Sequence, residues 1–98
     1  MFQEIALERE PISVLSRKPI RELTVNCMSH ILPKGRYPKF RLYKKNIMIL
    51  TPREHRLYDF GTMKERNAYA EKTGCDWGVI HKMKDELKEE YELKYGKL

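Results

Sequence analysis

Two short apolar runs stand in the first half of the chain, and helical spacing of apolar residues dominates the second half. The runs lie near residues 25–31 and 46–51, and each has the length and composition of a buried strand. A Pro-Lys-Gly sequence follows the first run and favours a turn. We therefore predict a two-stranded antiparallel hairpin whose strands are joined by a long loop, residues 33–45.

A strong helix start follows the second apolar run. Thr51 can cap the first turn, Pro52 suits the first helical position, and Glu54 completes a capping box. Gly61 is a natural stop. The pattern predicts a helix over residues 52–60, and it gives Glu54 a structural role that competes with a role as a metal ligand.

Two further helices are predicted beyond this point. Residues 63–72 form one amphipathic segment that ends near Gly74, and a second helix begins with Trp77. The apolar positions of this second helix recur at steps of three and four: Val79, Ile80, Met83, Leu87 and Tyr91. His81 lies off the apolar stripe, so we interpret it as a surface histidine.

The first 23 residues have no clean period. Pro11 and Pro19 divide them into short pieces, although the first nine residues could form a short helix or strand. We therefore predict that this segment is an irregular arm that packs on the hairpin or on a partner.

Composition adds an electrostatic expectation. Twenty Lys and Arg residues against 14 Asp and Glu residues give a formal net charge of +6. Such an excess favours an anionic partner, and a solvated basic surface explains it equally well. The two cysteines, Cys27 and Cys75, are far apart, so they indicate neither a disulfide framework nor a paired-cysteine zinc site. No run has the length of a membrane span and no signal-peptide pattern begins the chain, so we expect a cytoplasmic protein without a membrane partner.

Much of the positive charge lies in the predicted loop, which carries no acidic residue. Clustered cations of this kind can neutralise phosphates. Aromatic residues stand among them and could stack on bases, but large aromatics more often supply burial, so we expect Phe40 and one tyrosine in the core. The cations expected to contact nucleic acid are Lys34, Arg36, Lys39, Arg41, Lys44, Lys45 and Arg53.

Candidate chemistry comes from polar residues beside the apolar runs. His55 and Asp59 are four residues apart on the predicted helix, which places them on one face about one turn apart. An imidazole and a carboxylate in this arrangement can bind one divalent cation. His30 closes the first run and would approach the same place from the neighbouring strand.

The order His30, Asn46, His55 resembles the HNH endonucleases, whose site is a ββα-metal finger. His30 is followed by the Pro-Lys-Gly loop, and Asn46 directly precedes the second apolar run. Asp59 stands four residues after His55, where the colicin-type nucleases have a second metal ligand. The resemblance covers residues 24–61. It implies an α+β fold in which residues 1–98 form one domain: an irregular N-terminal arm (1–23), a ββα-metal core (24–61) and C-terminal helices (62–98).

The resemblance also implies a function, namely hydrolysis of phosphodiester bonds in DNA, most simply double-stranded DNA. The catalytic residues would be His30 as general base, Asn46 as support for the loop that bears it, and His55. His55 and Asp59 would hold one divalent metal ion, Mg²⁺ first and Mn²⁺, Ni²⁺ or Zn²⁺ as alternatives.

One position departs from the family pattern. Many members have an acidic residue or histidine directly before the first motif histidine, and this chain has Ser29, a weak ligand for a hard cation. Two alternatives to the nuclease therefore stay open: a catalytically inactive HNH-like module that binds nucleic acid, and a basic structural or interaction protein of a phage or mobile element.

Overall fold

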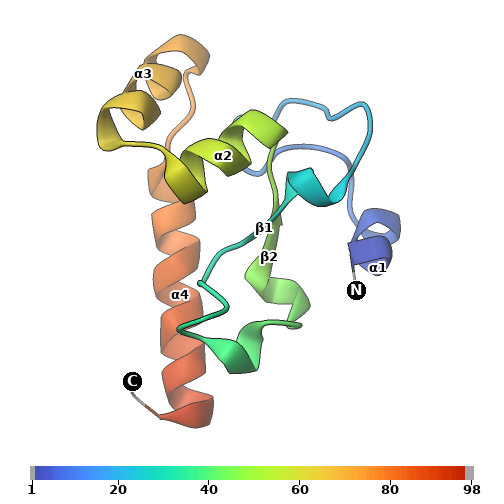
Figure 1. Ribbon diagram of the computed structural model, residues 1–98, viewed down its shortest axis with the longest axis vertical. Coiled ribbons are helices and arrows are strands. Elements are labelled where there is room, and N and C mark those ends of the chain that lie inside the picture. The colour runs from blue at the N-terminus through green and yellow to red at the C-terminus, as the bar shows by residue number, and fades with distance from the viewer. Residues whose placement is uncertain (1, 97–98) are drawn as a thin grey trace.

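The computed structural model describes residues 2–96, which form a mixed α+β fold of four α-helices and one two-stranded sheet (Figure 1). The helices and strands are α1 (Phe2–Glu8), β1 (Met28–His30), β2 (Ile47–Ile49), α2 (Pro52–Phe60), α3 (Met63–Thr73) and α4 (Gly78–Tyr95). Three short 3₁₀ turns stand beside them: Val25–Cys27, Pro38–Phe40 and Lys44–Asn46.

The predicted hairpin and the helix after it are confirmed. The two strands pair antiparallel, with Met28 opposite Ile49, Ser29 opposite Met48, and His30 opposite Ile47. Both strands are shorter than predicted, because a 3₁₀ turn occupies the residues just before each of them. The helix α2 begins at Pro52 with the predicted capping box and ends at Phe60, before Gly61.

The sheet separates two apolar clusters because side chains alternate between its faces. On one face, Met28, Ile47 and Ile49 pack with Ile5 of α1. On the other face, Met48 belongs to the larger cluster, to which α4 contributes Ile80, Leu87 and Tyr91. In Figure 1, α1 and α4 accordingly lie on opposite sides of the strands.

The N-terminal arm is more regular than predicted. Its first residues form the helix α1, although a helix of seven residues is marginal in isolation. Packing supplies the missing stability, because Ile5 is fully buried against the sheet. The arm therefore packs on the hairpin, and of the two forms allowed for the first nine residues, helix or strand, the structure has the helix.

A buried carboxylate joins the arm to α2. Glu54 is fully buried, and its Oε1 accepts hydrogen bonds from Ser13 Oγ at 2.5 Å and from the Thr51 amide at 2.9 Å. Its Oε2 accepts a third, from Tyr69 Oη of α3 at 2.7 Å. Burial by itself raises the pKa of Glu54, but these hydrogen bonds outweigh it, and the pKa lies below its usual value. Burial and the Glu54 carboxylate together raise the pKa of Tyr69 to about 12.

The C-terminal helices follow the prediction. Gly74 takes a left-handed conformation, with φ of 75°, just after α3, and glycine adopts it without steric cost. Trp77 anchors the start of α4 by donating from Nε1 to the Arg66 carbonyl at 2.9 Å. Phe40 is buried against Tyr91, as expected for a core aromatic. Within residues 2–96, no helix has the length and apolar character needed to cross a membrane.

Candidate active site

All three histidines of the chain line one pocket beside β1, although 25 or more residues separate each from the next. His30 comes from the end of β1, His55 from α2 and His81 from α4. The pocket has a volume of about 640 Å³ and also contains Asp59. The predicted site residues His30, His55 and Asp59 thus line one pocket, and His81, which is exposed as predicted, lines it too.

The main chain of the loop between the two strands, residues 33–45, fixes the His30 ring. Its Nε2 lies 3.0 Å from the carbonyl oxygen of Arg41. A carbonyl only accepts hydrogen bonds, so Nε2 carries the proton and donates it. In the neutral ring Nδ1 then has a free lone pair. A half-buried imidazole held in this tautomer is arranged as a proton acceptor.

The His55 ring is held in the opposite tautomer to His30. Its Nδ1 lies 2.8 Å from the Asn26 carbonyl oxygen and therefore carries the proton in a neutral ring. Its Nε2 lies 2.9 Å from Oδ2 of Asp59. A nitrogen lone pair and a carboxylate oxygen at this separation would repel, so either a proton on Nε2 or a cation between the two must compensate.

The separation of these two atoms suits a small divalent cation. Adjacent ligands of an octahedral ion lie about 3.0 Å apart when each is about 2.1 Å from the metal. Magnesium commonly takes only one or two protein ligands and completes its shell with water and phosphate oxygens. Within residues 2–96 no group of three or more His, Cys, Asp or Glu side chains is arranged to hold a metal. The His55 and Asp59 pair therefore fits such a cation as a two-ligand site.

Ser29 does not extend this pair. It is fully buried, it does not line the pocket, and its Oγ has no hydrogen-bond partner in the described part of the chain. Because neighbouring residues of a strand face opposite sides, Ser29 points away from the face that bears His30. An aspartate at this position would place a carboxylate in the core instead of the pocket.

Asn46 holds the loop that follows His30. It is fully buried, its Oδ1 accepts from the Leu32 amide at 2.7 Å, and its Nδ2 donates to the carbonyls of Leu32 at 3.1 Å and Phe40 at 3.3 Å. These bonds tie both ends of the segment between β1 and the turn at Phe40. The same segment leads to Arg41, whose carbonyl binds the His30 ring.

A neighbouring hydroxyl supports the same segment. Tyr58 Oη donates to the Ile31 carbonyl at 2.6 Å, directly after His30. Burial raises the pKa of Tyr58, and the charge of Asp59 adds to the shift, so the hydroxyl keeps its proton. The main chain on the C-terminal side of His30 is therefore held by side chains from two directions.

Most of the predicted nucleic-acid cations lie outside the pocket. Lys34 lines the pocket. The other predicted cations do not line it, and four of them are exposed side chains on the loop or at the start of α2: Arg36, Lys39, Lys45 and Arg53. Arg41 contributes its backbone carbonyl to the site and exposes its side chain.

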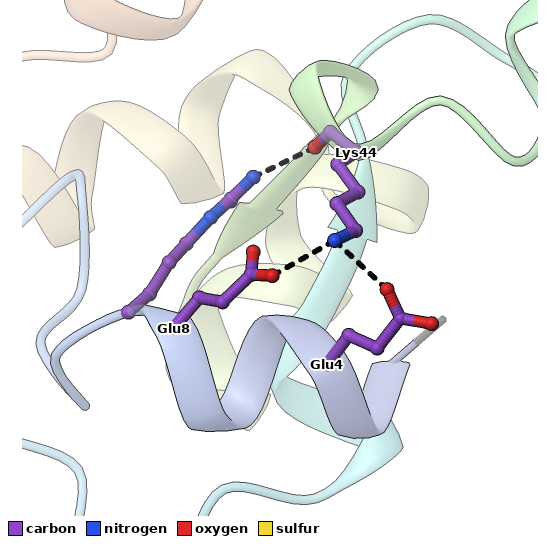
Figure 2. Close-up of polar contacts among 4 residues, drawn as sticks. Glu4, Glu8 and Lys44 are labelled. Carbon is purple, nitrogen blue, oxygen red and sulfur yellow. Dashed lines mark hydrogen bonds and ion pairs between the residues drawn. The ribbon is translucent and has the colours of Figure 1, made fainter.

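Lys44 is already paired with acidic residues. Figure 2 shows its ammonium group between two carboxylates of α1, Glu4 at 2.8 Å and Glu8 at 2.9 Å. The hydrogen bonds that Lys44 donates to Glu4 and Glu8 raise the pKa of Lys44. Arg9 adds a backbone contact by donating to the Lys44 carbonyl at 2.7 Å. The charge of Lys44 is thus largely matched within the protein, and Lys44 is less available to a phosphate than the sequence suggested.

The sequence interpretation did not include His81 and Lys84 of α4 among its site residues, nor Arg66 of α3. A signal for the two α4 residues is present, since Trp77, His81 and Lys84 follow helical spacing on one face of α4. The local pattern could not show that this face meets β1, because the direction of α4 is set by packing of distant residues.

No protein-family model, curated protein or solved structure matches this chain.

Proposed function

We propose that this protein is a metal-dependent HNH-type endonuclease that hydrolyses phosphodiester bonds in DNA, with a ββα-metal finger formed by β1, β2 and α2. The observation that carries the proposal is the shared pocket, in which His30 and His55 are fixed as opposite tautomers by backbone carbonyls. One ring then offers Nδ1 as a base, and the other offers Nε2, with Asp59, to a cation.

The residues of the chain have separate tasks in this reaction. Nδ1 of His30 takes a proton from the attacking water as the new oxygen–phosphorus bond forms and the bond to the leaving oxygen breaks. The Arg41 carbonyl stabilises the resulting imidazolium through Nε2. A divalent cation, Mg²⁺ first, held by His55 and Asp59 would supply stabilisation of the negative charge on the phosphate and leaving oxygens.

Plasmid nicking tests the proposal. Wild type should nick DNA with Mg²⁺ or Mn²⁺ and lose activity in EDTA. His30→Ala should lower single-turnover cleavage by about 10²–10⁴-fold with little change in DNA affinity, because a general base acts in the transition state. His55→Ala should abolish the metal response, and calorimetric titration with the metal should show the lost binding directly.

Far-UV circular dichroism of each variant provides the folding control. If a folded His30→Ala cleaves as fast as wild type at saturating enzyme, His30 is not the base. Wild type that shows no divalent-ion binding would remove the metal from the proposal.

The second candidate is a nucleic-acid-binding module without catalysis. It is favoured by one observation, the two-ligand set in the described residues with Ser29 buried away from the pocket. This candidate predicts salt-dependent DNA retention without cleavage in any metal. A purely structural or interaction protein would show neither cleavage nor salt-dependent retention.

A further inference from the structure

The pocket beside β1 has an excess of positive charge. Its lining includes three cations, Lys34, Arg66 and Lys84, and Asp59 as its carboxylate. Asp59 is paired with His55 through the 2.9 Å contact. Three cations against one carboxylate leave the pocket with a net positive charge whichever form His55 takes.

The three cations differ in their availability. Arg66 donates to the carbonyls of Leu57 at 3.0 Å and Gly61 at 2.7 Å, so its guanidinium closes the C-terminal end of α2. Lys34 and Lys84, in contrast, make no hydrogen bond or ion pair with any side chain or carbonyl in residues 2–96. Two ammonium groups from different segments thus share one pocket without a protein partner.

These two lysines line the pocket from different parts of the chain. Lys34 lies in the loop directly after β1, close in sequence to His30, whereas Lys84 lies on α4, one turn beyond His81. Lys34 is exposed and Lys84 is half-buried, with its position set by the rigid helix. Because His30 lines the same pocket, a ligand held there by both lysines would share that pocket with His30.

We propose that Lys84 of α4 and Lys34 bind phosphates of the DNA substrate, so that α4 forms part of the substrate site. The inference rests on the proposed function for the identity of the ligand. Two ammonium groups act as point charges and need no fixed geometry, which suits phosphates of a flexible backbone. Because these phosphates neighbour the reacting one, the lysines affect binding more than the chemical step.

Fluorescence anisotropy with a labelled DNA duplex in EDTA measures this contribution without cleavage. Each phosphate contact steepens the slope of log affinity against log salt by about 0.9. Lys84→Ala should therefore flatten the slope by about 0.9 and weaken binding about 8-fold at 0.1 M salt, the factor that this slope gives relative to 1 M. Lys34→Ala should do the same, and Lys84→Arg should stay close to wild type.

Lys82→Ala is the matched control, because Lys82 is an exposed lysine of the same helix that does not line the pocket. It removes the same formal charge and should leave the slope almost unchanged. Thermal melting of each variant shows whether loss of the Lys84 stem affects folding.

The outcomes separate the inference from the proposed function. If wild type binds and cleaves DNA and Lys84→Ala behaves as Lys82→Ala does, the inference is overturned and the nuclease stands. If wild type binds without cleaving and only the pocket lysines weaken binding, the inference stands and the nuclease fails. Wild type that does not bind DNA at all overturns both.

Discussion

Replacing Asn46 with alanine should destabilise the fold and loosen the site at once. The variant loses the hydrogen bonds to the Leu32 amide and to the Leu32 and Phe40 carbonyls, all in a fully buried environment. The Phe40 carbonyl still accepts a hydrogen bond from the Tyr43 amide at 3.1 Å, so the Leu32 amide and carbonyl are the two groups left without a partner. An orphaned buried polar group costs about 1–3 kcal/mol, so the total is about 2–5 kcal/mol. A domain of this size has a free energy of unfolding of roughly 5–15 kcal/mol, so the variant should be marginal.

Urea denaturation followed by Trp77 fluorescence and far-UV circular dichroism measures this loss. Asn67→Ala is the control, because Asn67 is an exposed asparagine of α3, and its unfolding free energy should change by less than about 0.5 kcal/mol. A folded Asn46→Ala protein should also lose activity, since the loop that carries the Arg41 carbonyl is freed from its anchor. The reasoning is refuted if Asn46→Ala unfolds within about 1 kcal/mol of wild type.

Three further predictions concern charged groups. The lowered pKa of Glu54 means that its carboxylate stabilises the fold above the usual glutamate pKa of about 4.3 and that this contribution is lost as the pH falls. Glu54→Gln should therefore be less stable at neutral pH but show a shallower acid dependence in melting curves, and an unchanged slope would contradict the assignment. Lys44→Ala should weaken DNA binding less than Lys34→Ala, because Glu4 and Glu8 of α1 already pair with Lys44. Anisotropy titrations measure both losses of affinity, and equal losses would contradict this prediction. Asp59→Asn should weaken Mg²⁺ binding by removing the charged ligand, and identical calorimetric isotherms would exclude Asp59 as a ligand.

The sequence predicted those parts of the fold that depend on neighbouring residues. Thr51, Pro52 and Glu54 specify the start of α2 within four positions, so the helix begins where the pattern places it. The contact between His55 and Asp59 could likewise be predicted from their spacing, because one helical turn brings the two side chains together. Phe40 is buried, as expected from the general tendency of large aromatic side chains to lie in the core.

Long-range pairings could not be predicted in this way. Nothing near Lys44 indicates that Glu4 and Glu8, 36 or more residues earlier, match its charge. The capping role of Glu54 was evident, but its bond to Ser13, 41 residues away, was not. The composition of a pocket depends on how elements cross, and a helical pattern specifies which residues share a face without saying what that face meets.

The bond between Ser13 and Glu54 has a consequence for how the chain folds. The capping box of α2 is formed by Thr51 and Glu54 themselves, but the Glu54 carboxylate gains its bond from Ser13 only when the arm, 41 residues earlier, has closed onto it. Until then the Glu54 carboxylate must stay hydrated, which opposes its burial and so opposes docking of α2 on the sheet. Docking of α2, which bears His55, is therefore coupled to closure of that long loop, and the entropy of loop closure opposes both. Opening of the arm and opening of the candidate site should accordingly be one cooperative event on the timescale of hydrogen exchange.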